Sequence, residues 1–153
     1  MEELSIPRLE ELSLELNDLK SGKERDYRTD FFLLKGLIKS FEMCFDLSWK
    51  VMKDIIRDYY GTNDYALGSP GENIRVAYRN GLIEDDATWL KLLRTRNRLV
   101  HDYDGEYAET VADEIVEEYT PFLVEFESRM YSFVNEHEED IRKARESAGG
   151  YHV

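Results

Sequence analysis

The chain has 153 residues, 42% hydrophobic and 35% charged, which is typical of one globular domain with a charged surface. A single cysteine, Cys44, excludes an internal disulfide and favours a reducing compartment. The formal net charge of −13 opposes nonspecific binding to nucleic acid, although a local RNA site is compatible with it. No apolar run is long enough to span a membrane, and the acidic N-terminal segment lacks the apolar core of a signal peptide. We therefore expect a soluble, cytoplasmic protein without a membrane partner.

The first two predicted helices cover residues 6–20 and 30–60. In both segments apolar residues recur at three- and four-residue steps, which is the pattern of a helix with one buried face. Pro7 suits the first turn of the first helix, and either Asp30 or Thr29 can cap the start of the second. Residues 62–67 are then expected to form a loop.

Three further helices are predicted after this loop. Ser69 and Pro70 should begin a short third helix, which the Asn80-Gly81 pair should end. A fourth helix should start near Asp85 or Asp86 and end where residues 102–105 interrupt the apolar pattern. A long fifth helix is expected over residues 106–135, with a kink at Pro121.

No segment alternates between apolar and polar residues with a period of two, so strands are not expected. Long helices with short connections predict an all-α fold, an up-and-down antiparallel bundle of about five helices. We expect a single domain over residues 1–136. Residues 137–153 are charged and contain the pair Gly149-Gly150 near their end, so they are expected to form a flexible C-terminal tail.

The chain has three histidines, and they do not lie in the spacings that bind metals. His137 and His152 fall in the charged C-terminal stretch, without nearby ligand pairs. HExxH, CxxC, Walker, GxGxxG and GxSxG motifs are not found in the sequence. We therefore expect no metal site and no cofactor.

The third histidine, His101, follows a basic run that contains Arg96 and Asn97. A run of basic residues is often only the solvated face of a helix, and that interpretation stays open. Asn97 and His101 share a helix face, whereas Arg96 and His101 are rotated by about 140° on one straight helix. Arg96 and His101 could meet if the helix ends near His101, if the arginine reaches round, or if two copies meet across a two-fold axis.

These residue types could cleave RNA without a metal. An imidazole can take the proton of a 2′-hydroxyl, whose oxygen then attacks the adjacent phosphorus. A guanidinium can hold the phosphate through two hydrogen bonds and stabilise the developing negative charge. Arg96 and His101 are accordingly the candidate catalytic residues, with Asn97 supporting either of them.

The string Arg96-Asn97-xxx-His101-Asp102-Tyr103 resembles the RNxxxHxY form of the HEPN signature. Segments before this string are also similar to that family, and they contain Phe45-Asp46-Leu47-Ser48-Trp49, Ser69-Pro70-Gly71-Glu72 and Trp89. The resemblance as a whole extends over about residues 27–134. The resemblance is strongest with the small HEPN proteins once labelled nucleotidyltransferase substrate-binding proteins. Those proteins are toxins encoded beside a minimal nucleotidyltransferase (MNT) antitoxin.

The resemblance implies a helical homodimer with a composite cleft, in which Arg96 and His101 are catalytic and Asn97 supports them. It implies a metal-independent endoribonuclease, the toxin of a type VII-like toxin–antitoxin system, acting on tRNA or mRNA. It also implies that the cognate nucleotidyltransferase silences the toxin by adenylylating Tyr103. Trp89 is a candidate for packing at the dimer interface.

Two other hypotheses remain open at the level of sequence. The chain could be a non-catalytic accessory subunit of a nucleotidyltransferase that binds a nucleotide or presents a substrate. It could also be a helical interaction scaffold, which is all that composition supports. Asp102 and Asp104 flank the motif and oppose the approach of RNA, so the sequence alone does not choose among the three.

Overall fold

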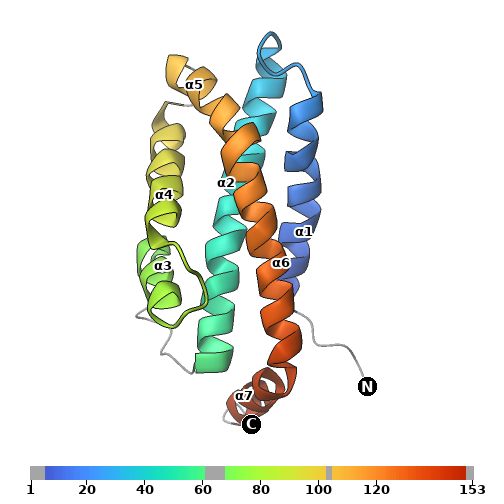
Figure 1. The fold of residues 1–153 in the computed structure, drawn as a ribbon, viewed down its shortest axis with the longest axis vertical. Helices are drawn as coiled ribbons and strands as arrows, with labels where there is room; N and C mark the ends of the chain where they lie inside the picture. The colour runs from blue at the N-terminus through green and yellow to red at the C-terminus, as the bar shows by residue number, and fades with distance from the viewer. Residues whose placement is uncertain (1–5, 61–67, 103–104, 151–153) are drawn as a thin grey trace.

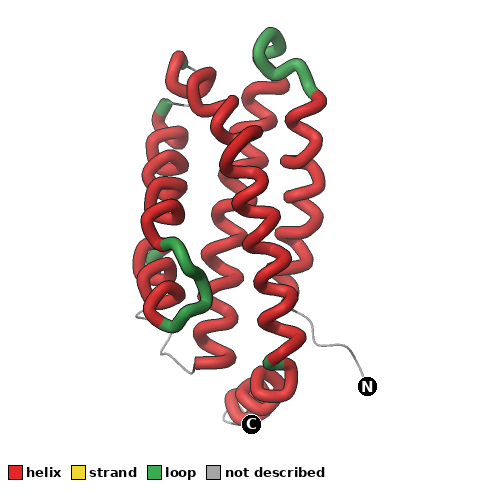
Figure 2. The backbone as a smooth tube through the Cα atoms, in the orientation of Figure 1, coloured by secondary structure: helices red, strands yellow, loops and turns green. Residues whose placement is uncertain are grey.

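A computed structural model describes residues 6–60, 68–102 and 105–150 of the chain. Within these ranges the regular structure is helical and contains no strand, and loops join the helices (Figure 2). The expected loop at 62–67 lies outside the described residues. The helices are α1 (Pro7–Lys20), α2 (Phe31–Ile55), α3 (Pro70–Arg79), α4 (Asp86–His101), α5 (Glu106–Glu114), α6 (Thr120–Glu136) and α7 (Glu138–Gly150), with the shorter segments η1 (Ser21–Glu24), η2 (Ile56–Tyr60) and η4 (Ile115–Tyr119).

The helices form the predicted up-and-down bundle, with α2 at its centre. Figure 1 shows α1, α2, α4 and α6 running alternately up and down, with the short α3 below α4. α2 contacts α1, α3, α4, α5 and α6, because its apolar face is broad enough to serve all of them. None of the helices in the described ranges combines the length and the apolarity that a membrane crossing requires.

Three helix starts are capped by side chains: those of α2 and α3 as the sequence predicts, and that of α4 by Asp85, near which its start was expected. The Asp30 carboxylate accepts hydrogen bonds from the backbone N–H groups of Phe32 and Leu33, at 2.9 and 3.3 Å. The Ser69 hydroxyl accepts one from the backbone of Glu72, and Asp85 accepts one from the backbone of Thr88. These side chains satisfy N–H groups that have no partner within the helix.

An aromatic cluster fixes α4 against the rest of the bundle. The Trp89 ring of α4 lies 6.3 Å from Phe45 of α2 and 4.8 Å from Phe126 of α6, measured between ring centroids. Only 2% of Trp89 is exposed. The expectation that Trp89 packs at a dimer interface was therefore wrong, because the other helices of the same chain already bury this side chain.

The predicted fifth helix is divided by a π-helical turn. α5 and α6 are joined through η4, one turn before Pro121, and Figure 1 shows α5 inclined to α6. The Thr120 hydroxyl donates a hydrogen bond to the Ile115 carbonyl at 2.7 Å, which satisfies a backbone acceptor where the helical ladder is interrupted. The helix is thus interrupted at Ile115–Tyr119, slightly before Pro121, where the kink was expected.

The C-terminal segment differs from the flexible tail that we expected. It forms α7, which buries Ile141 and places the Arg145 guanidinium 2.8 Å from the Asp58 carboxylate. Sequence reasoning missed the packing of α7 because the segment that α7 contacts, η2, lies far away along the chain. The division of the chain into a domain of residues 1–136 and a tail stays a prediction.

Candidate functional site

The predicted catalytic arginine, Arg96, bridges α4 and α2. Its Nη2 donates a hydrogen bond to Oδ1 of Asp46 at 2.8 Å. The two side chains are 26% and 33% exposed, so the ion pair is partly shielded from water but still accessible. Aromatic packing of α4 onto α2 sets the distance between the helices and brings the two groups together.

A second hydrogen bond fixes the orientation of the guanidinium. Nη1 of Arg96 donates to the amide oxygen of its neighbour Asn97 at 3.0 Å. The same oxygen of Asp46 that accepts from Arg96 also accepts from the indole N–H of Trp49 at 3.4 Å. A guanidinium has five N–H groups, so three remain for a ligand after Asp46 and Asn97 are satisfied. Asn97, the predicted supporting residue, is thus in direct contact with Arg96, and its role stays a prediction.

Arg96 lies in the wall of a groove between α2 and α4 with a volume of about 500 Å³. The α2 side is charged and the α4 side is largely apolar; the lining residues are Lys35, Ile38, Lys39, Glu42, Asp46, Arg96, Leu99 and Val100. Three of these side chains are cationic and two are carboxylates, so the groove has a net positive charge in a strongly acidic protein. A phosphate is therefore attracted to this groove more than to the surrounding surface.

One carboxyl group in the groove is perturbed by its surroundings. Burial raises the pKa of Glu42, and the nearby charge of Asp46 raises it further, while Lys39 and Arg96 oppose the shift. The Lys39 ammonium lies 3.9 Å from this carboxylate, at the limit of an ion pair. A carboxyl group that takes up a proton more readily repels a phosphate less.

His101 is the last residue of α4, and its side chain is exposed. It lies five residues after Arg96, about 7.5 Å further along the helix axis, and forms no hydrogen bond or ion pair with the residues described. The structure thus brings Arg96 and Asn97 together and leaves the imidazole apart, at the end of the helix. Tyr103, the predicted modification position, lies outside the described residues.

His137 has a structural environment, in contrast to His101. Its ring stacks on Phe133 with centroids 4.2 Å apart and meets the edge of Tyr59 at 4.7 Å. Its Nδ1 lies 2.9 Å from the Phe133 carbonyl oxygen. His152 lies beyond the residues that the structure describes. Over the described ranges, histidine, cysteine and carboxylate side chains do not gather in groups of three that could hold a metal ion.

Sequence reasoning missed the α2 side of the groove. Lys35, Lys39, Glu42 and Asp46 are spaced by four, three and four residues, so they form one charged stripe beside the apolar face of the helix. That helical spacing of charged residues was a signal available in the sequence. The partner of the stripe, Arg96, is 50 residues away from Asp46 along the chain, and only the packing of the helices reveals the pairing.

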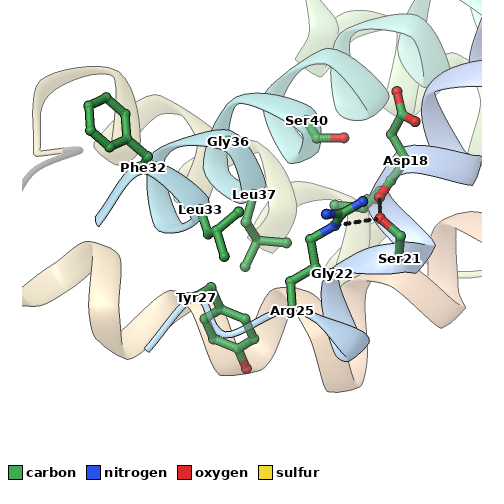
Figure 3. Close-up of a pocket in the computed structure, with 11 residues that line it drawn as sticks. Asp18, Ser21, Gly22, Arg25, Tyr27, Phe32, Leu33, Gly36, Leu37 and Ser40 are labelled. Atoms are coloured by element: carbon green, nitrogen blue, oxygen red, sulfur yellow. Dashed lines mark hydrogen bonds between the residues drawn. The ribbon is translucent and has the colours of Figure 1, made fainter. Parts of the chain in front are cut away.

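A second pocket lies on another face of α2, where its first turns meet η1 and the end of α1. Figure 3 shows its lining, in which the Arg25 side chain donates a hydrogen bond to the Ser21 hydroxyl at 3.4 Å. Its volume is about 220 Å³, and its walls are mainly apolar. Of the predicted site residues that the structure describes, Arg96, Asn97 and His101 do not line this pocket.

Comparisons with known proteins relate the chain to one family and to two relatives. A family model described as "Nucleotidyltransferase substrate binding protein like" matches residues 7–132. A Haemophilus influenzae protein named "Probable ribonuclease HepT" is 35% identical over 94 residues, which are 61% of this chain and 62% of that protein, so the match spans less than two thirds of the relative. A solved Haemophilus influenzae structure, described as the fold of a substrate binding domain of a nucleotidyltransferase, superposes with a TM-score of 0.53 at 28% identity, covering 90% of this chain and 91% of the other.

Proposed function

Because the chain belongs to the nucleotidyltransferase substrate binding protein like family, we propose that it is a HEPN-type toxin with metal-independent endoribonuclease activity. The single observation that carries the proposal is the Arg96 guanidinium, held by Asp46 and Asn97 in the wall of a positively charged groove. The similarity to a protein named as a ribonuclease supports the same reaction class.

In the proposed reaction His101 acts as the general base. It removes the proton of a ribose 2′-hydroxyl, and the 2′-oxygen attacks the adjacent phosphorus. The P–O5′ bond breaks, the leaving 5′-oxygen takes up a proton from water, and His101 returns its proton to the solvent. Arg96 stabilises the negative charge on the nonbridging oxygens throughout. The products are a 2′,3′-cyclic phosphate and a 5′-hydroxyl end, and no step requires a metal ion.

A homodimer would complete the site. Arg96 and His101 lie on one helix, and His101 is exposed at the end of that helix. A two-fold axis beside this end of α4 would bring the imidazole of one copy toward the guanidinium of the other. Two motifs would then act on one phosphodiester in a composite cleft.

The proposed regulator is a cognate minimal nucleotidyltransferase that attaches AMP to Tyr103, two residues after His101. A bulky anionic group there would obstruct the cleft and compete for its arginines. Incubation of the chain with that enzyme and ATP, followed by mass spectrometry, tests the modification. An AMP adduct on another residue, or none, would contradict this half of the proposal.

Cleavage of purified tRNA and mRNA in the presence of EDTA tests the nuclease activity. The parent chain should produce 2′,3′-cyclic phosphate ends, and His101→Ala should abolish cleavage while the circular dichroism spectrum stays unchanged. His137→Ala is the matched control, because that ring packs on Phe133 and should leave cleavage intact in whatever protein stays folded. Equal activity in the parent and His101→Ala would refute the role of His101.

A non-catalytic accessory subunit is the second candidate. The family description and the description of the solved relative both refer to substrate binding for a nucleotidyltransferase. This alternative predicts a complex with the nucleotidyltransferase and no RNA cleavage under any condition. The cleavage assay with EDTA therefore separates the two candidates.

A further inference from the structure

The groove continues along α2 beyond Arg96, and its other cations have no place in the proposed motif. Lys39 lies seven residues before Asp46 on α2, which is about 10.5 Å along the helix axis, and Lys35 lies one turn further. Neighbouring phosphates in a duplex strand are about 3.4 Å apart along the axis. The groove is therefore long enough for more than one phosphate.

An exposed aromatic ring stands at the far end of this stripe. The Lys35 ammonium lies 4.6 Å from the centroid of the Phe31 ring, and Phe31 is 49% exposed. A ring in this position offers a flat apolar surface beside a cation. Single-stranded nucleic acids bind to this combination, because the bases stack on the aromatic ring while the backbone follows the positive charge.

The direction of the groove relates the stripe to the cleavage motif. α2 and α4 run antiparallel (Figure 1), so the path from Arg96 to His101 on α4 leads the same way as the path from Asp46 to Lys35 on α2. On the α4 wall, the exposed side chain of Val100 can contact ribose or base carbons, and the buried Leu99 lies beneath the groove. A strand that leaves Arg96 along the groove therefore passes Lys39, then Lys35, then Phe31.

We propose that this surface of α2 is a binding site for single-stranded RNA next to the scissile phosphate, in which Lys39 and Lys35 hold backbone phosphates and Phe31 stacks on a base. The inference rests on the proposed function, since Arg96 marks the cleaved phosphate. It assigns the substrate class: an unpaired RNA segment, whose bases can separate and stack.

The test measures binding of a fluorescein-labelled, mixed-sequence single-stranded RNA to the full chain carrying His101→Ala, by fluorescence anisotropy at several salt concentrations. Lys39→Gln and Lys35→Gln should each weaken binding several-fold and lower the slope of log K against log salt by about 0.7. Lys39→Arg should restore most of the affinity.

Two matched controls are available in the chain. Lys143 is 70% exposed and lies 3.7 Å from Glu139, much as Lys39 is 71% exposed and lies 3.9 Å from Glu42, so Lys143→Gln should leave affinity and slope unchanged. Phe32 neighbours Phe31 but lines the other pocket (Figure 3). Phe31→Leu should weaken binding about tenfold without changing the salt slope, and Phe32→Leu should have no effect.

The outcomes separate this inference from the proposed function. Cleavage that needs His101, together with unchanged RNA affinity in the lysine and Phe31 variants, would overturn the inference alone. RNA binding that depends on Lys39 and Phe31, without cleavage by the parent chain, would support the inference and refute the nuclease. Changed sedimentation of Phe31→Leu with unchanged RNA affinity would make the stripe a contact between copies, which would overturn the inference.

Discussion

Two regions of α2 carry arginine–aspartate pairs, and their surroundings give them different roles. In the groove, Asp46 is 33% exposed and holds one arginine, Arg96. Near the C-terminal end of α2, Asp54 and Asp58 are 11% and 10% exposed as side chains. They contact arginines from three segments: Arg8 of α1, Arg57 of η2 and Arg145 of α7.

The difference lies in what the arginines can still reach. At the C-terminal end of α2 the guanidiniums converge on two carboxylates and tie α1 and α7 to the central helix, which is a structural role. In the groove the guanidinium borders an open volume of about 500 Å³ and keeps donors for a ligand. The chemistry of the pair is the same in both places, and the open space beside it decides whether a ligand can reach the guanidinium.

The largest expected effect on cleavage distinguishes Arg96 in the groove from Arg8 at the C-terminal end of α2. Arg96→Ala should lower RNA cleavage by about 100- to 1000-fold, because a donor to the developing negative charge is lost. Arg8→Ala removes an arginine that also pairs with an aspartate of α2, and it should leave cleavage unchanged. Initial rates of cleavage measure both variants. Equal losses in the two would show that the groove pair is only structural.

The next effect concerns Asp46, which we regard as a positioning residue. Asp46→Asn should lower kcat about tenfold, because the guanidinium loses its orientation. It should also tighten RNA binding, because a negative charge leaves the groove. Separate measurement of kcat and of RNA affinity checks this split. Weaker binding with unchanged kcat would contradict the positioning role.

A smaller effect, on stability, is expected for the pairs at the C-terminal end of α2. Asp58→Ala should lower the free energy of unfolding by about 1–2 kcal/mol, since a buried acceptor and its link to α7 are lost. Cleavage by the folded protein should not change. Urea unfolding followed by circular dichroism measures the first quantity and initial rates the second. A loss of activity at full stability would mean that this region also serves the reaction.

The smallest expected effect is a dependence of stability on pH. Burial raises the pKa of Asp54, helped by the charge of Asp58 and opposed by Arg8 and Arg57. The folded state therefore binds this proton more tightly than the unfolded chain, and the resulting stability is present at acidic pH and is lost as the pH rises through the raised pKa. Asp54→Asn should remove this component from unfolding curves measured across that range.

Asp85 provides a control of opposite sign. The Thr88 hydroxyl and backbone N–H donate hydrogen bonds to its carboxylate and lower its pKa. Its stabilisation is present above the ordinary pKa of an aspartate and is lost as the pH falls through the lowered value. Asp85→Asn should therefore reduce the loss of unfolding free energy as the pH falls into the acidic range. The same pH response in both variants would refute the two assignments.

Local patterns in the sequence predict much of the fold. Apolar spacing gave the helices, and Asp30, Ser69 and Asp85 marked their starts, because both signals act within a few residues of the chain. The division of the fifth helix was placed only approximately, because the π turn of η4 depends on packing as well as on Pro121. The helix over residues 138–150 was missed, since its Arg145 pairs with Asp58, which is 87 positions away along the chain.

The sequence by itself determined the chemical groups of the candidate site, Arg96, Asn97 and His101, because they are neighbours in one short motif. Only the tertiary structure decided what these groups contact: Arg96 pairs with Asp46, while His101 stays exposed at the end of α4. It also decided that Lys39 and Lys35 share a groove with Arg96. The physical reason is that helix packing, which buries Trp89 between α2 and α6, sets the distance between α2 and α4, and no local pattern encodes that distance.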